Sequence, residues 1–369
     1  MSSARRWRSS LALRSLGGRI RAAGLYLTAW EAAEKVRNTL RGRIMISLHQ
    51  ANGEGRPILF IGSSRIGDAV LGSGVLARLV ETTPQAPVTV ACGPLALPLF
   101  ADVPNLQRLH PLIRRKGGGQ WWDLWKASIG QHWRVIADLR GSALAWTLRA
   151  DRRLVCRAQK RREHRIEELG RQLGLDPLPA PKLWISPERD RRAALRLGEG
   201  PVLAVGPTAN WAPKQWPAER FAEVVRQLTA PDGILPGARV AVFGAEAERA
   251  MAAPVVAAVP PGRLIDVIGG DDLLDAYALL RRCSFYVGND SGMMHLAAAA
   301  GLPTLGLFGP SPDWRYGPWG ARTAVVRTPL SFEELVSENP GFDHRRQECL
   351  MTGLTVERVV EAAVALSHR

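Results

Sequence analysis

Asp290, Ser291 and His295 are the side chains best suited to chemistry, and they lie in one short stretch. An apolar strand is predicted just before them, and an Ala-rich helix is predicted after the polar turn Gly288–Gly292. Such a turn presents free backbone N–H groups and the positive end of the helix dipole to an anion. Asp290 can cap the helix or direct its carboxylate at a hydroxyl group, and Ser291 can donate to a phosphate. The alternative is an ordinary capped helix in which His295 only packs.

Asp68 is a second candidate, at the end of the loop Gly62–Asp68. The loop follows a predicted strand at Pro57–Ile61 and precedes a predicted helix at Ala69–Val80, as at the opening of a parallel α/β domain. A phosphate-cradling loop would carry Lys and Ser or Thr after its second glycine, so the acid argues against triphosphate binding. We expect Asp68 to act as a base, unless it only caps the helix.

Thr208 and Lys214 form a third group, in the loop after a predicted strand at Val202–Val205. A hydroxyl and an ammonium group beside the carboxyl end of a strand would suit a diphosphate. The alternative for Lys214 is an exposed lysine in a surface loop.

Basic residues provide a fourth set of candidates. Arg114, Arg115 and Lys116 open a segment rich in glycine and tryptophan, which could hold a phosphorylated partner through basic donors and aromatic stacking. The same segment could instead be a helix whose tryptophans pack on the core. Arg140 follows a predicted strand at Val135–Leu139, at the end where open α/β sheets bind their ligands.

Strand–loop–helix units recur in both halves of the sequence and position these residues. Leu175–Pro187 holds four prolines and reads as the connection between two domains. The predicted fold is α/β, with two Rossmann-like domains facing across a cleft. We place an extension at 1–50, domains at 51–180 and 181–350, and a C-terminal helix at 351–369. Further elements are expected at Val88–Ala91, Arg239–Phe243, Leu264–Val267, Leu273–Arg281, Phe285–Val287, Thr304–Phe308, Ala324–Arg327 and Val356–Ser367.

The composition is that of a soluble globular protein, with 46% hydrophobic and 22% charged residues in 369. The four cysteines are far apart and match neither a zinc site nor a disulfide framework, which favours a reducing cytoplasm. No metal cluster is predicted. No apolar run approaches the roughly 20 residues that a membrane-spanning helix needs.

The net charge of +15 is concentrated near the start of the chain. Residues 1–45 hold ten Arg or Lys and two Glu. This arm could lie on an anionic membrane surface or form a solvated extension. Nucleic-acid binding is disfavoured because no reader motif is present, and a nicotinamide dehydrogenase is disfavoured because no loop reads GxGxxG.

Several motifs occur in an order that resembles glycosyltransferase family nine, which includes ADP-heptose:lipopolysaccharide heptosyltransferases. They are PILFIGSSRIGDAVLGSGVL, TANWAPKQWP, YVGNDSGMMHLAAAAGLPTLGLFGP, YGPWG and ECLMTGLTVERVVEA. The resemblance runs from Pro57 to Leu366. It implies the B-type glycosyltransferase fold and an inverting, metal-independent transfer without a cofactor. One departure is the sequence Leu71-Gly72-Ser73-Gly74, whose glycines are expected to loosen the first helix by about 1 kcal/mol each.

The resemblance also implies roles for the candidate residues. Asp68 corresponds to the general base of the family. The donor would be bound by Thr208, Lys214, Asp290, Ser291, Gly292 and His295. The acceptor would lie on the N-terminal domain, where the basic candidates are Arg65, Arg114, Arg115, Lys116 and Arg140.

The expected function is therefore transfer of a heptose from ADP-heptose to a lipopolysaccharide core acceptor. The enzyme would be cytoplasmic, with peripheral contact to the inner membrane through residues 1–45. The alternatives are another nucleotide sugar with a different glycolipid or glycan acceptor, and a non-catalytic module that binds a nucleotide sugar.

Overall fold

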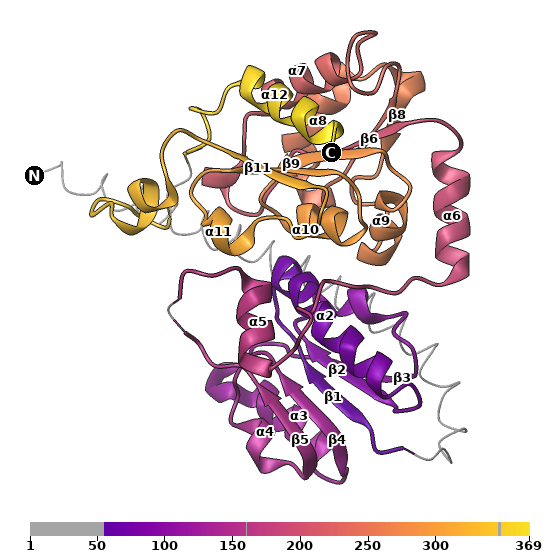
Figure 1. Cartoon of the computed structure of the whole chain (residues 1–369), viewed down its shortest axis with the longest axis vertical. Helices are drawn as coiled ribbons and strands as arrows, with labels where there is room; N and C mark the ends of the chain where they lie inside the picture. Colours follow the sequence, from indigo (N-terminus) through magenta and orange to yellow (C-terminus); the bar gives the residue numbers. More distant parts are fainter. Residues whose placement is uncertain (1–54, 160, 346–347) are drawn as a thin grey trace, which may run out of the picture. The chain divides into compact units, whose positions relative to one another are not determined.

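The computed structural model describes residues 55–159, 161–345 and 348–369, and Gly55–Arg369 forms one compact unit (Figure 1). The predicted extension at 1–50 and the membrane arm at 1–45 lie outside the described residues. No described helix is both long and apolar enough to cross a membrane. The four cysteines Cys92, Cys156, Cys283 and Cys349 are free thiols.

The first sheet has five parallel strands in the order β3-β2-β1-β4-β5. β1 is central, and Ile58 pairs with Val88 on one side and Val135 on the other. Every residue of β1 and β2 is buried, which is why these strands read as continuous apolar runs. The strands are β1 (Ile58–Ile61), β2 (Val88–Cys92), β3 (Leu106–Pro111), β4 (Trp133–Asp138) and β5 (Ala150–Val155). The helices of this half are α2 (Ile66–Thr82), α3 (Gly119–Ser128), α4 (Leu144–Thr147) and α5 (Arg165–Leu173).

Helix α2 is continuous through the glycines that were expected to loosen it. A methyl group at Gly74 would lie 2.1 Å from the Pro179 carbonyl oxygen, and the Ser73 hydroxyl accepts a hydrogen bond from the Lys182 backbone at 3.0 Å. The glycine therefore lets the proline-rich connection lie against α2.

The proline-rich connection leads into α6 (Pro187–Leu197), a helix that the sequence reading did not predict. The Ser186 hydroxyl accepts from the Arg189 backbone and Pro187 occupies the first turn, a standard helix start. The Arg189 side chain pairs with Asp102 at 3.1 Å and with Asp272 at 2.8 Å. These pairs join α6 to both halves of the compact unit.

The second sheet has six parallel strands in the order β11-β10-β9-β6-β7-β8. Its core includes Trp216, whose indole donates to the Leu354 carbonyl at 3.0 Å, so the C-terminal residues are tied to this sheet. The strands are β6 (Val202–Gly206), β7 (Arg239–Val242), β8 (Leu264–Asp266), β9 (Phe285–Asn289), β10 (Thr304–Phe308) and β11 (Thr323–Arg327). The helices are α7 (Ala218–Leu228), α8 (Arg249–Ala258), α9 (Leu273–Leu280), α10 (Gly292–Ala299), α11 (Asp313–Tyr316) and α12 (Val356–Ser367).

Helices α2 and α10 pack against each other, although they follow strands of different sheets (Figure 1). Each begins just after the carboxyl end of a central strand, β1 or β9. Open α/β sheets bind ligands at this end. The packing therefore brings the two loops with the best candidate residues together.

Candidate functional site

The turn between β9 and α10 is fixed by a buried amide. The Asn289 side chain is fully buried, accepts from the Trp216 backbone at 3.1 Å and donates to the Pro207 carbonyl at 2.8 Å. These bonds tie the turn to the loop after β6. The loops that carry Lys214 and Asp290 are therefore parts of one structure.

Lys214 and Asp290 form an ion pair within this structure. The Lys214 ammonium lies 2.5 Å from the Asp290 carboxylate, whose side chain is only 6% exposed. Asp290 does not cap α10, since the N-cap residue is Ser291 and, among residues 55–159, 161–345 and 348–369, no side chain forms a capping hydrogen bond with this helix. Lys214 is likewise not the solvated surface lysine of the alternative reading, because its side chain is 23% exposed and paired.

His295 is buried beside the loop that carries Asp68. A methyl group at Gly67 would lie 2.7 Å from Cδ2 of His295, and one at Gly292 would lie 2.6 Å from the Ile66 side chain. Burial lowers the pKa of His295 to about 4, against the opposing field of Asp290. The imidazole is therefore neutral near pH 7, and its Nδ1 has no hydrogen-bonding partner among the described residues.

Asp68 lies in the first turn of α2 and is partly exposed. Helix α2 begins at Ile66, its N-cap residue is Arg65, and the described residues show no side-chain hydrogen bond at this cap. An acid in the first turn also interacts favourably with the helix dipole, so the alternative role of Asp68 as a helix-terminal acid stays open. Burial raises the pKa of its carboxyl, Arg165, Arg65 and Arg315 oppose that shift, and Asp290 adds to it. The close approach of Gly67 to His295 places this acid from the first half beside the turn of the second half.

The Thr208 side chain is buried, although the sequence placed it in a polar loop. Its hydroxyl donates to Glu248 at 2.7 Å, and the same carboxylate oxygen accepts from the Ala245 backbone at 3.0 Å. Glu248 was not a candidate, because an acid that opens a helix looks like any other in a sequence. The Ser291 hydroxyl is buried, and none of the residues that the structure describes lies in hydrogen-bonding geometry with it.

The basic candidates divide into two groups. Arg140 donates to the Ser64 hydroxyl at 3.0 Å, which places it at the loop of Arg65 and Asp68. Buried Asp138 holds the Arg140 turn by accepting from its backbone N–H at 2.9 Å.

Arg114, Arg115 and Lys116 are exposed and precede α3. Arg115 pairs with Asp123 at 2.8 Å. The reading of this segment as a helix with tryptophans on the core is confirmed for Trp121 and Trp125, whereas Trp122 is exposed. Binding of a phosphorylated partner by this segment stays a prediction. The Arg140 guanidinium lies 5.1 Å from the centroid of the Trp121 ring.

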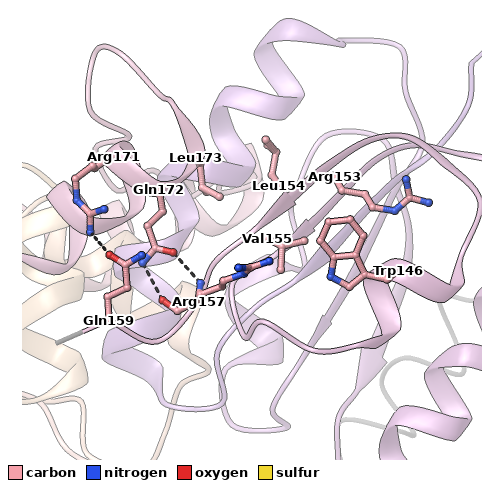
Figure 2. Close-up of a pocket in the computed structure, with 9 residues that line it drawn as sticks. All are labelled: Trp146, Arg153, Leu154, Val155, Arg157, Gln159, Arg171, Gln172 and Leu173. Carbon is pink, nitrogen blue, oxygen red and sulfur yellow. Dashed lines mark hydrogen bonds between the residues drawn. The ribbon is translucent and has the colours of Figure 1, made fainter. Parts of the chain in front are cut away.

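A separate hollow of about 490 Å³ lies beside edge strand β5 (Figure 2). None of the sequence candidates lines it. Gln172 closes one side by bonding the backbone N–H and carbonyl of Arg157 at 2.7 and 2.9 Å. The lining residues are Trp146, Arg153, Leu154, Val155, Arg157, Gln159, Arg171, Gln172 and Leu173.

Comparison with known proteins agrees with this architecture. The model of glycosyltransferase family 9 (heptosyltransferase) matches residues 153–340, slightly more than half of the chain. The chain belongs to glycosyltransferase family 9. It is therefore a glycosyltransferase, and the resemblance of its motifs to this family is confirmed.

Curated relatives are similar along most of their length. "Lipooligosaccharide heptosyltransferase 2" of Haemophilus influenzae is 23% identical over 351 residues, covering 82% of this chain and 97% of the relative. "Lipopolysaccharide heptosyltransferase 2" of Escherichia coli is 24% identical, covering 84% and 98%.

Solved structures share the fold. The family 9 glycosyltransferase of Veillonella parvula matches with a TM-score of 0.67 at 21% identity, covering 85% of this chain and 97% of that one. The E. coli ADP-heptose lipopolysaccharide heptosyltransferase II matches with a TM-score of 0.64 at 21% identity, covering 85% and 98%. The predicted fold class, two Rossmann-like halves of the B type, is confirmed.

Proposed function

We propose that this family 9 enzyme transfers a heptose from ADP-heptose to a sugar of the lipopolysaccharide core, with inversion at the anomeric carbon. The observation that carries the proposal is the contact between the Gly67–Asp68 loop and His295, which puts a candidate base beside a candidate diphosphate site. The names of the similar proteins support heptose as the sugar and lipopolysaccharide as the acceptor.

The donor diphosphate would be held at the start of α10. The free N–H groups of the helix and the Ser291 hydroxyl offer donors, and the Lys214 ammonium supplies a full positive charge. These groups can stabilise the negative charge that develops on the leaving diphosphate, so the transfer would proceed without a metal ion. Thr208, Gly292 and His295 would complete this side of the site.

Asp68 would act as the general base. Its carboxylate takes the proton of the acceptor hydroxyl while that oxygen attacks the anomeric carbon, and the carbon–oxygen bond to the diphosphate breaks on the opposite face. Base assistance of this kind typically contributes about 10²–10⁴-fold in rate. The raised pKa of Asp68 makes it a stronger base than an ordinary aspartate.

The acceptor would bind on the first half of the chain, with the donor on the second. Arg65 and Arg140 border the loop of Asp68 and suit an anionic acceptor, and Arg114, Arg115 and Lys116 extend the basic surface. We place the acceptor domain at 51–180 and the nucleotide-sugar domain at 181–350. The enzyme would work in the cytoplasm, with residues 1–45 at the inner membrane.

The test is incubation of the purified chain with ADP-heptose, UDP-sugars or GDP-sugars and truncated lipopolysaccharide acceptors, with products identified by mass spectrometry. We expect one added heptose with ADP-heptose alone. Transfer from another nucleotide sugar would overturn the donor assignment, and donor binding without transfer to any acceptor would indicate a non-catalytic module.

A further inference from the structure

Glu168 is a buried acid outside the family motifs, and it joins the two halves of the compact unit. Its side chain is 2% exposed, and one carboxylate oxygen accepts from Arg165 at 2.6 Å and from Arg315 at 2.7 Å. Arg165 and Glu168 belong to the first turn of α5, whereas Arg315 belongs to α11. One buried carboxylate thus holds two arginines from opposite halves.

His164 strengthens the same contact between α5 and α11. Its Nδ1 accepts from the Ile166 backbone at 3.2 Å, so Nε2 carries the proton and donates to the Gly317 carbonyl at 3.1 Å. The His164 and Trp319 rings stack with centroids 4.7 Å apart. Burial lowers the pKa of His164 below its usual value, which keeps this donor neutral.

Helix α5 packs against α2, the helix that carries Asp68, and Glu168 holds Arg315 next to Arg165 at the start of α5. Both arginines oppose the rise in the pKa of the Asp68 carboxyl that burial causes. The other charged or titratable groups near it are Arg65 of its own loop, Asp290 with its partner Lys214, and His295 of α10. The negative charge of Glu168 offsets one of the two positive charges of the arginines. Glu168, Arg165 and Arg315 together therefore carry a single positive charge, which stabilises ionised Asp68.

We infer that Glu168 is a positioning residue, which holds Arg165 and Arg315 beside Asp68 so that the contact between α5 and α11 keeps the base ionised. The inference rests on the proposed role of Asp68. It assigns the Glu168 cluster a part in the transfer step that no motif of the sequence indicates. The base would then be fully active only when the two halves are joined at this contact.

The experiment is the pH dependence of kcat/KM for wild type, Arg315→Gln and Glu168→Gln. Loss of one nearby cation typically raises a carboxyl pKa by about 1–3 units, so the acid limb of Arg315→Gln should move up by about one pH unit. Glu168→Gln should move the acid limb in the same direction, because Arg165 and Arg315, no longer held by Glu168, would move away from Asp68. Arg315→Lys, which keeps the charge, should restore most of the wild-type limb.

Asp102→Asn is the matched control, because it weakens the Arg189 contact between α6 and β2–β3 without facing Asp68. It should leave the acid limb in place. An unchanged limb in Arg315→Gln would overturn the inference. A downward shift in Glu168→Gln would also overturn it, since Glu168 would then act only as an additional negative charge.

A second measurement separates failure of this inference from failure of the proposed function. The pKa of Asp68 can be followed directly by ¹³C NMR of Asp-labelled protein, with Asp68→Asn used to assign the signal. If wild type transfers no sugar, the proposed function fails, while the NMR titration of Arg315→Gln still tests the inference. A pKa of Asp68 that is the same in Arg315→Gln and wild type would refute it. If Glu168→Gln does not fold, Arg315→Gln decides alone, because the Arg315 side chain is partly exposed.

Discussion

The Lys214–Asp290 pair allows stability and donor binding to be separated in one set of variants. Removing one partner of a fully buried pair costs about 3–5 kcal/mol, because the other charge stays buried without compensation. Asp290 is 6% exposed and Lys214 is 23% exposed, so water reaches this pair in part. We therefore expect Lys214→Met to lower the free energy of unfolding by about 2–3 kcal/mol.

Adding Asp290→Asn should restore much of that stability, because it removes the buried charge. The second substitution should not restore binding of the donor. A charge-assisted hydrogen bond to a phosphate contributes about 1.5–3 kcal/mol, so both the single and the double variant should bind ADP-heptose roughly 10–100-fold more weakly.

Urea denaturation and titration calorimetry measure the two quantities. Lys182→Met is the control, since Lys182 pairs with Glu81 at 2.8 Å on the exposed surface and should change neither quantity appreciably. If the double variant regained donor affinity together with stability, Lys214 would have only a structural role. If Lys214→Met left stability unchanged, the reasoning from burial would be refuted.

Three further predictions concern the same site. Gly67→Ala should reduce both stability and transfer, because its methyl group would clash with the His295 side chain. Gly130→Ala should affect neither, since no atom lies within contact distance of its methyl group. Thermal unfolding and product yield measure the two effects. The folded-state pKa of His295, about 4, lies below the usual value near 6.5. Between pH 4 and 6.5 the histidine is therefore protonated only in the unfolded chain. The free energy of unfolding should accordingly fall as the pH drops from 6.5 to 4. The loss is at most about 3 kcal/mol, and His295→Gln should flatten this part of a plot of unfolding free energy against pH. Transfer should continue in excess EDTA if Lys214 and α10 stabilise the leaving diphosphate, and its loss on chelation would contradict that assignment.

The elements predicted best from the sequence are those whose residues are buried on every side. β1, β9 and β10 are fully buried and appear as short apolar runs, and α12 has the predicted bounds Val356–Ser367. Helix α6 was missed because its buried face consists only of Arg189, Ala193 and Leu197, so few large apolar residues mark the helical spacing. The sequence Ser186-Pro187 at its start was the available signal.

The sequence suggested candidate site residues only where they lie close together in the chain. Asp290, Ser291 and His295 lie in one short stretch, and its position after a glycine loop made Asp68 a candidate. Glu168 and Arg315 are 147 residues apart, and their pairing depends on the packing of α5 on α11. No local pattern of charge or hydrophobicity marks two such residues as partners, so the structure was needed to find them.

The most direct test of the account compares wild type and Asp68→Asn in two assays, calorimetric binding of ADP-heptose and single-turnover transfer to a truncated lipopolysaccharide acceptor. The proposal predicts donor affinity within a few-fold of wild type and a loss of transfer on the order of 10²–10⁴-fold. Transfer at the wild-type rate by Asp68→Asn would contradict the central claim that an acid from the first half deprotonates the acceptor.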